Sequence, residues 1–231
     1  MSTPKNVQFD EVQANEEATQ VIRKARGFWE KYSKPIVYGG GALIILLAGY
    51  YGFKKFYSQP REEKANEAIW HAQQYFEQDS LRLALNGDGQ YAGFEKVAKT
   101  HSGTKAGNLA KFYAGICNLR LGDYKKAVDY LGDFSTPAKE IQAIAYSRLA
   151  DAYAELGKKE EALKNYEKAA RHFPEQESLS AENLFRAGLL AETMGKNDQA
   201  IKYYKEIKEK YGRTEKGYQV DKYLARLGVV E

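Results

Sequence analysis

The chain has 231 residues, among them 35 lysines and arginines and 31 aspartates and glutamates, for a formal net charge of +4. Charges of both signs are interspersed along its length, which is typical of solvated helix faces and disfavours a surface for nucleic acid. The single cysteine, Cys117, excludes an internal disulfide and a cysteine-based metal site, and its apolar surroundings predict a buried thiol. The length is sufficient for a sizeable core in one or two domains.

The first 34 residues are polar overall and precede a long apolar run. Residues 1–20 are expected to be flexible. After them, apolar side chains recur at helical spacing with charged side chains opposite. The apolar positions are Val21, Ala25, Phe28 or Trp29, and Tyr32, and the charged ones are Arg23, Lys24, Glu30 and Lys31. This pattern predicts a short juxtamembrane amphipathic helix on the inner leaflet, with its basic residues near anionic lipid; the alternative is a simple extension of the next helix.

An uncharged apolar segment occupies residues 36–53. As a helix it would be about 27 Å long, close to the roughly 30 Å hydrocarbon thickness of a bilayer. Lysines flank it, and tyrosines lie near its ends, where interfacial aromatic residues are common. We predict a single transmembrane helix over residues 35–53, uncleaved because the polar segment before it is too long for a signal peptide. A core helix of a soluble protein is the alternative, but such a helix rarely lacks charge on every face.

The residues around and within this segment indicate how the predicted span is oriented in the membrane and whether it contacts another membrane helix. Five basic residues precede it and four follow it, which favours a cytoplasmic N-terminus and a C-terminal domain on the other side of the membrane. Gly41, Ala48 and Gly52 are small enough to let a second membrane helix approach closely. The ordinary frequency of glycine in membrane helices explains them equally well.

Residues 54–231 show helical periodicity and internal repeats. Residues 141–175 match the tetratricopeptide pattern at Leu149, Ala150, Tyr153, Gly157, Ala162, Tyr166, Ala169 and Pro174. Two neighbouring segments share this register, because the glycines that close the first helices, Gly122, Gly157 and Gly195, lie 35 and 38 residues apart, near the roughly 34 residues of the repeat. Small residues at matching positions would let the paired helices approach closely; they are Gly115, Ala150 and Gly188, and Ala127, Ala162 and Ala200.

The repeats define the predicted domains. The first of these domains, residues 54–106, contains a long helix over 61–78 and a degenerate first repeat with a second helix within 90–104. Three repeats follow in residues 107–212. The last domain, residues 213–231, contains a capping helix over 216–227. Because no single repeat can bury its own apolar face, the units must stack. The predicted fold class is all-α: a single N-terminal transmembrane helix followed by an α-solenoid of tetratricopeptide-type helical hairpins.

An anchor followed by a long helix, a degenerate unit and three repeats, from about Lys31 to the end, resembles the YfgM family of bacterial inner-membrane proteins. The resemblance implies an accessory role at the Sec translocon, with the N-terminus cytoplasmic and the repeat domain periplasmic. It also implies a membrane-anchored peptidyl-prolyl isomerase-like chaperone and translocating polypeptides as partners. The alternative is a structural scaffold or regulator of another envelope machine, in outer-membrane assembly, secretion or division, that binds one folded partner.

No constellation of catalytic residues is evident. His71, His101 and His172 are dispersed and no phosphate-binding loop is present, so we expect no enzyme activity, no metal, no cofactor and no small-molecule substrate. The candidate site is a concave groove lined by the first helix of each pair, suited to an apolar or amphipathic polypeptide. Repeat register places there Phe112, Ile116, Ser147, Asp151, Glu182, Phe185 and Leu189. Equally open is that the apolar members belong to the core or are covered by the first long helix.

Overall fold

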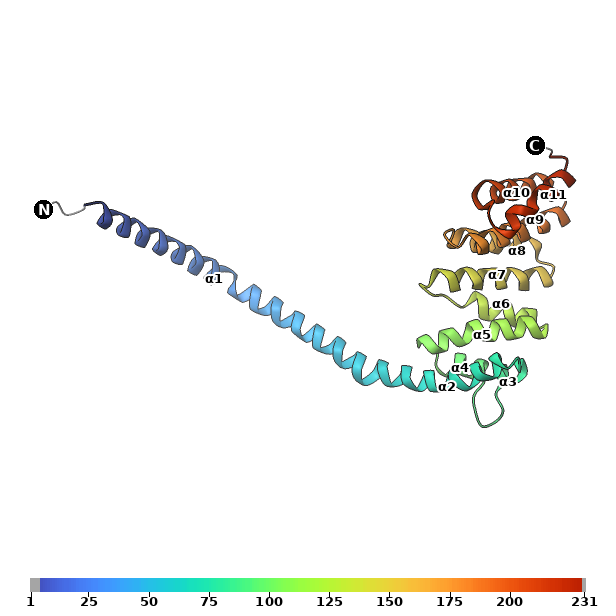
Figure 1. Cartoon of the computed structure of the whole chain (residues 1–231). Coiled ribbons are helices and arrows are strands. Elements are labelled where there is room, and N and C mark those ends of the chain that lie inside the picture. Colours follow the sequence, from blue (N-terminus) through green and yellow to red (C-terminus); the bar gives the residue numbers. More distant parts are fainter. Residues whose placement is uncertain (1–4, 230–231) are drawn as a thin grey trace. The chain divides into compact units, whose positions relative to one another are not determined.

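The computed structural model describes residues 5–229, with side chains at residues 19–35 and 37–229. The described residues form helices, apart from turns, loops and one isolated antiparallel bridge between Gly87 and Ala92. The chain divides into two compact units, Met1–Gln59 and Pro60–Glu231. In the second unit the predicted all-helical solenoid is confirmed (Figure 1).

The first unit contains one long helix, α1 (Lys5–Phe53), followed by a π-helical turn, Lys54–Ser58. The helix begins within the segment that we expected to be flexible, of which residues 1–4 lie outside the described part. Pro35 lies inside α1, and a bend of 45° separates Thr19–Pro35 from Val37–Glu77. A bend is expected there, because proline removes a backbone hydrogen bond and its ring contacts the preceding turn.

The apolar run of α1 bears on the predicted membrane span. Among the described residues, no single helix is both long and apolar enough to cross a bilayer. The bent pair Thr19–Pro35 and Val37–Glu77 meets these requirements of length and composition when its two parts are taken together. The side chain of Ile36, the first residue of the apolar run, lies outside the described ones.

The second unit begins with three helices, α2 (Gln59–Glu77), α3 (Leu81–Asn86) and α4 (Phe94–Thr100). The long helix predicted over 61–78 corresponds to α2. The second helix predicted for the degenerate first repeat corresponds to α4, which is shorter than the segment 90–104, and the sequence did not predict α3. A turn occupies the start of that segment, because the Asp88 carboxylate accepts hydrogen bonds from the backbone N–H groups of Gln90 (2.9 Å) and Tyr91 (2.7 Å).

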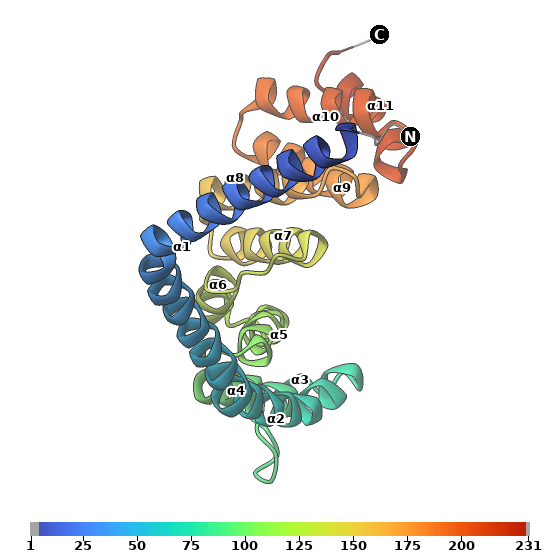
Figure 2. The same ribbon diagram turned by 90° about the vertical axis from the view of Figure 1, so that its left-hand side faces the viewer.

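Three helical hairpins and a final helix complete the second unit. They are α5 (Lys105–Leu121) with α6 (Tyr124–Gly132), α7 (Lys139–Glu155) with α8 (Lys159–His172), α9 (Glu177–Thr193) with α10 (Asn197–Tyr211), and α11 (Glu215–Arg226). The hairpins stack in chain order, as Figures 1 and 2 show. The predicted capping helix corresponds to α11, and residues 230–231 at the end of its segment lie outside the described part.

Glycines end the first helix of each hairpin, as the sequence predicted. Gly122, Gly157 and Gly195 have φ angles of 85°, 72° and 71°, in the left-handed region that favours glycine. After each of them the next residue donates its N–H to a carbonyl five residues earlier, as Lys158 does to Tyr153 (2.9 Å). This hydrogen bond satisfies a carbonyl at the helix end and reverses the chain.

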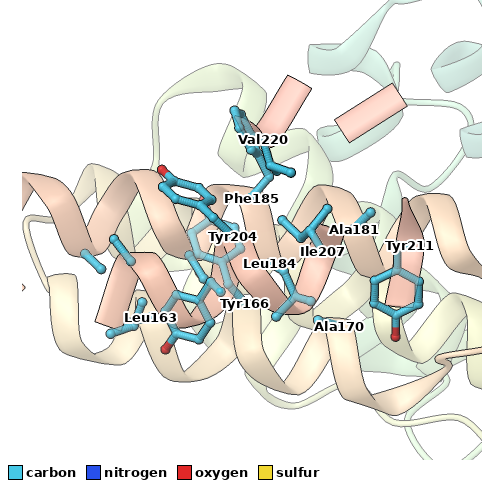
Figure 3. Packing of buried hydrophobic residues seen from close by; sticks show 14 of the residues in the cluster. Leu163, Tyr166, Ala170, Ala181, Leu184, Phe185, Tyr204, Ile207, Tyr211 and Val220 are labelled. Atoms are coloured by element: carbon cyan, nitrogen blue, oxygen red, sulfur yellow. The ribbon is translucent and has the colours of Figure 1, made fainter. Parts of the chain in front are cut away.

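The close approach of paired helices also follows from small residues. A Cβ atom on Gly188 would lie 2.4 Å from Cε1 of Tyr204, and one on Gly115 would lie 2.5 Å from Cγ of Leu131. Ala127, Ala162 and Ala200 are fully buried. The core formed by α7–α11 is shown in part in Figure 3, where Leu184, Tyr204, Ile207 and Val220 interdigitate; all four are at most 1% exposed.

The first helix of the first full hairpin, α5, has its N-terminus bound from two sides. The Thr104 hydroxyl accepts a hydrogen bond from the N–H of Gly107 (2.9 Å). The Glu62 carboxylate of α2 accepts hydrogen bonds from the N–H groups of Lys105 and Ala106, both at 2.9 Å. A carboxylate at a helix N-terminus satisfies free donors and interacts favourably with the helix dipole. These bonds join α2 to the first hairpin.

Candidate functional site

The predicted groove residues all lie on first helices of hairpins. They are Phe112 and Ile116 in α5, Ser147 and Asp151 in α7, and Glu182, Phe185 and Leu189 in α9. We call the surface formed by these helices the first-helix face. Phe112, Ser147 and Phe185 are only 8%, 5% and 6% exposed, whereas the other four residues are half-buried. The set therefore divides into core residues and residues that reach the surface.

The two phenylalanines of the set are covered by aromatic rings that follow them in the stack. The ring of Phe112 lies 5.1 Å from that of Phe134, in the loop between α6 and α7. The ring of Phe185 lies 4.8 Å from that of Tyr223 of α11, edge to face. Such contacts contribute beyond the burial of apolar area. Both phenylalanines are core residues, because the loop after α6 covers Phe112 and the final helix α11 covers Phe185.

Asp151 accepts hydrogen bonds from three side chains. The Tyr166 hydroxyl of α8 lies 2.7 Å from Oδ1, and Nη1 of Arg186 lies 2.9 Å from the same oxygen. Nη1 of Arg148 donates to Oδ2 at 2.9 Å. Burial, and then the charge of Asp151, raise the pKa of Tyr166 above its ordinary value. Because Arg186 belongs to α9, the Asp151 carboxylate links one repeat to the next.

Glu182 extends this network to the end of the stack. Nε of Arg186 donates to its Oε1 at 2.7 Å, and Nζ of Lys216, in α11, lies 3.4 Å from its Oε2. Burial alone would raise the pKa of Glu182, but Arg186 and Lys216 outweigh it, and the pKa is lowered. The two acids predicted for the groove are thus paired with cations of their own chain. They stiffen the stack and offer no unpaired carboxylate to a ligand.

A second network of the same kind joins α9, α10 and α11. The Tyr204 hydroxyl lies 2.5 Å from Oε1 of Glu192, and Nη2 of Arg226 lies 2.7 and 2.8 Å from the two oxygens of that carboxylate. Burial, and then the hydrogen bond to Glu192, raise the pKa of Tyr204. Sequence reasoning missed both networks. Its one available signal was the recurrence of tyrosine at the position shared by Tyr166 and Tyr204.

The equivalent positions of the first hairpin form no such network. Ile116 and Leu131 occupy the positions equivalent to Asp151 and Tyr166, so the junction between α5–α6 and α7 is apolar. Next to this junction a surface cleft of about 710 Å³ lies between the N-terminal ends of α5 and α7. Its apolar lining residues are Leu109, Phe134, Pro137 and Ile141, and its polar ones include Asn108, Lys111 and Asp133.

Two interactions shape this cleft. Nδ2 of Asn108 donates to the carbonyl oxygen of Ser135 at 2.8 Å, and Nζ of Lys111 lies 2.5 Å from Oδ2 of Asp133. Both connect α5 to the loop that begins after α6. Ile141 at the cleft edge is 38% exposed. The arrangement provides an apolar floor with a rim that can form hydrogen bonds, as peptide-binding clefts do.

The titratable side chains that could serve chemistry are used in packing. The imidazole of His71 stacks on the ring of Tyr91 with centroids 3.4 Å apart, and His172 lies edge-on to Tyr146 at 5.4 Å. Cys117 is fully buried, and burial raises the pKa of its thiol to about 12. Within residues 19–35 and 37–229, no three histidine, cysteine, aspartate or glutamate side chains are grouped so that they could bind a metal ion.

Comparison with known families agrees with the repeat geometry. The model of the tetratricopeptide repeat-like domain matches residues 26–227. The chain belongs to this family. The crystal structure of MamA protein is similar to the chain at 18% sequence identity and a TM-score of 0.40, with 78% of this chain and 98% of that chain covered. None of the curated proteins compared with the chain matches it.

The match to the tetratricopeptide repeat-like family begins ahead of the apolar run of α1 and includes it. The described side chains of that run are exposed; those of Ile44, Ile45 and Leu46 have exposed fractions of 68%, 72% and 70%. The small residues Gly41 and Gly52 also face open space, because a Cβ atom on either would meet nothing within 4 Å. Ala48 is exposed as well. The surface proposed for contact with another membrane helix is therefore unoccupied within this unit.

Proposed function

We propose that the chain is a non-catalytic, membrane-anchored interaction module, in which α1 crosses the bilayer and the repeat unit binds a polypeptide. The observation that carries this proposal is the pairing of a tetratricopeptide repeat-like unit with an uncharged helical run of 18 residues whose described side chains are exposed. The fold is one whose common use is protein binding. No site for a cofactor or a small substrate enters the proposal.

The exposure of the apolar run supports the anchor. Successive side chains from Leu43 to Leu47 are each at least 50% exposed, so apolar surface surrounds the helix. In water, exposed apolar area costs about 25 cal/mol per Å² relative to an apolar environment, and contiguous patches of this kind are typical of membrane or protein contacts. A bilayer accommodates all sides of such a helix at once. Flotation of the full chain with lipid vesicles, resistant to alkaline carbonate, tests this part.

The cleft between α5 and α7 is the proposed docking point on the first-helix face. Asp151 and Glu182 are occupied by ion pairs, whereas Leu109 and Ile141 line an open apolar cleft. An apolar side chain of a partner would fill the cleft. At its rim, Asn108 and Lys111 have N–H donors beyond those bound to Ser135 and Asp133, and these would bind the partner's backbone or carboxylates. An apolar or amphipathic polypeptide segment suits this lining.

The resemblance to the YfgM family supports a specific setting for this module. The anchor would lie in a bacterial inner membrane with the N-terminus cytoplasmic and the repeat unit periplasmic. There the chain would act as an accessory subunit of the Sec translocon and bind a membrane-anchored peptidyl-prolyl isomerase-like chaperone, translocating polypeptides, or both. A scaffold for another envelope machine, with one folded partner, would use the same cleft.

Site-specific photo-crosslinking in native membranes tests the docking point and the partner together. A photoreactive residue at Ile141, 38% exposed in the cleft, is compared with one at Tyr218, 77% exposed on α11 and outside it. We expect adducts with translocon or chaperone subunits from position 141 and none from position 218. Adducts with a single folded protein of another envelope machine would support the alternative. Equal labelling from both positions, or none, would reject the cleft as the docking point.

A further inference from the structure

The part of α1 that precedes the proposed span, Thr19–Pro35, has a strongly amphipathic surface. At about 100° per residue, its apolar side chains occupy an arc of about 120°. These are Val21, Ile22, Ala25, Phe28, Trp29 and Tyr32. The basic side chains Arg23, Lys24, Arg26, Lys31 and Lys34 all lie outside that arc, together with the segment's only acidic residue, Glu30.

The apolar arc is exposed. Val21, Ile22, Phe28 and Trp29 are 66%, 65%, 58% and 57% exposed, and Tyr32 is 40% exposed. The described ring contacts of this arc stay within the segment, since the Phe28 and Tyr32 rings lie 4.8 Å apart and Nζ of Lys31 lies 5.3 Å from the Tyr32 ring. An exposed apolar arc of this size, flanked by basic residues, requires a partner that is apolar in its interior and anionic at its surface.

The position of the segment in the chain identifies that partner. Pro35 ends it directly before the apolar run, and the helix bends by 45° at this point. A segment of 17 residues is about 26 Å long as a helix, so all of it remains within that distance of the membrane surface. Tethering at this range gives a high effective concentration of lipid headgroups. A bend lets one part of the helix lie along the surface while the next part crosses.

We propose that Thr19–Pro35 lies in the plane of the membrane and binds anionic lipid headgroups on the side of the N-terminus. The apolar arc enters the boundary between headgroups and acyl chains, and the basic residues contact phosphate and other anionic groups. The proposal rests on the proposed membrane anchor. Beyond that anchor, it predicts that the contact between this protein and the membrane depends on the charge of the lipids. The span alone would not cause such a dependence, because it is uncharged.

The two tryptophans of the chain make the test direct. In the full chain, W70F removes the tryptophan of α2 and leaves Trp29 in the apolar arc as the only one. This variant is reconstituted into vesicles of phosphatidylcholine alone or mixed with phosphatidylglycerol. Trp29 fluorescence is then quenched with acrylamide from the water phase and with lipids brominated at a shallow or a deep acyl position. We expect anionic lipid to shift Trp29 emission to the blue, protect it from acrylamide, and allow the shallow bromines to quench it most.

A charge variant in the same background tests the basic residues. Arg23→Gln, Lys24→Gln and Lys31→Gln together remove three positive charges, and each charge near an anionic surface changes the binding equilibrium by about fivefold. The equilibrium between the membrane-bound and the released segment should shift on the order of a hundredfold towards release, and added salt should have the same effect on the unmodified segment. The matched control, Lys125→Gln, Lys164→Gln and Lys222→Gln, removes three exposed charges of the repeat unit and should change nothing.

Flotation of the same vesicles separates the two proposals. If the chain floats with both lipid mixtures but Trp29 is equally accessible to acrylamide in both, the lipid-binding segment is refuted and the anchor stands. If deep bromines quench Trp29 most in both mixtures, the segment crosses the bilayer and the in-plane proposal is wrong. If the chain does not float at all, the anchor fails, and the segment's proposal fails with it.

Discussion

The contact between Gly188 and Tyr204 offers a sharp test of how the last hairpin is packed. Replacing Gly188 by alanine would place Cβ 2.4 Å from Cε1 and 2.7 Å from Cζ of the Tyr204 ring. The ring has little room to move, because it is fully buried, its hydroxyl is bound to Glu192, and the Phe185 and Tyr223 rings lie 5.9 and 5.6 Å away. To accept the methyl group, α9 and α10 must move apart.

The expected magnitude follows from two opposing effects. Overpacking in a well-packed core costs about 1–3 kcal/mol, and a contact of 2.4 Å with a fully buried ring belongs in the upper part of that range, at about 2–3 kcal/mol. Replacing a glycine in a helix by alanine gains about 1 kcal/mol. The net loss in the free energy of unfolding should therefore be about 1–2 kcal/mol. For a unit of this size each kcal/mol changes Tm by about 2–4 °C, so Gly188→Ala should lower Tm by about 2–8 °C.

The assay is thermal unfolding of the full chain in mild detergent, followed by far-ultraviolet circular dichroism. The matched control is Gly132→Ala at the end of α6, where a Cβ atom would meet nothing within 4 Å. It should leave Tm unchanged or raise it slightly, by the equivalent of about 0.4–1 kcal/mol. In a Tyr204→Ala background, Gly188→Ala should no longer destabilise, since the ring that it meets is absent.

One result would refute this reasoning. At the position equivalent to Gly188, helix α7 has Ala150, which lies opposite Tyr166 of α8. The α7–α8 hairpin therefore accommodates a methyl group at this position, with its two helices suitably spaced. If Gly188→Ala were as stable as the unmodified chain, α9 and α10 would adopt that spacing without cost. The close approach at Gly188 would then be a consequence of glycine rather than a requirement of the packing.

Three further predictions concern the buried polar groups. In a urea titration, Asp151→Ala should lower the free energy of unfolding by about 1–3 kcal/mol, because the side chains that donate hydrogen bonds to Asp151 lose their acceptor. The control is Asp133→Ala, which removes a carboxylate that is 72% exposed and should lower the free energy of unfolding by less than about 0.5 kcal/mol. Cys117, with its pKa raised to about 12, should react with a thiol reagent at neutral pH only as fast as the repeats unfold, and rapid labelling of the native chain would contradict its burial. The folded-state pKa values of Tyr166 and Tyr204 are raised above the ordinary 10.0. Their contribution to stability should be complete below pH 10 and lost as pH rises through the raised values, which tyrosinate absorbance and circular dichroism recorded together would show.

The repeat register was determined by local sequence. Closing glycines, small residues at fixed offsets and apolar spacing are requirements of each hairpin by itself, so they recur in the sequence wherever a hairpin forms. The φ angles of Gly122, Gly157 and Gly195 and the burial of Ala127, Ala162 and Ala200 agree with what this pattern predicted. The helix α3 was not predicted, because it depends on the turn around Asp88 rather than on a repeated pattern.

The state of the candidate groove depended on contacts between repeats. Register placed Phe112, Asp151 and Phe185 on the first helices, but it could not tell which of them later parts of the chain cover. Phe134 and Tyr223 bury the two phenylalanines, and Arg186 pairs with Asp151 across 35 positions of the chain.

The sequence by itself determined the helices, their pairing into hairpins and the uncharged run ahead of them, because these follow from residues close together in the chain. Only the tertiary structure decided which carboxylates are neutralised within the stack and which surface stays open. Those outcomes depend on which side chains from successive repeats come within hydrogen-bonding distance, and single-helix periodicity does not contain that information.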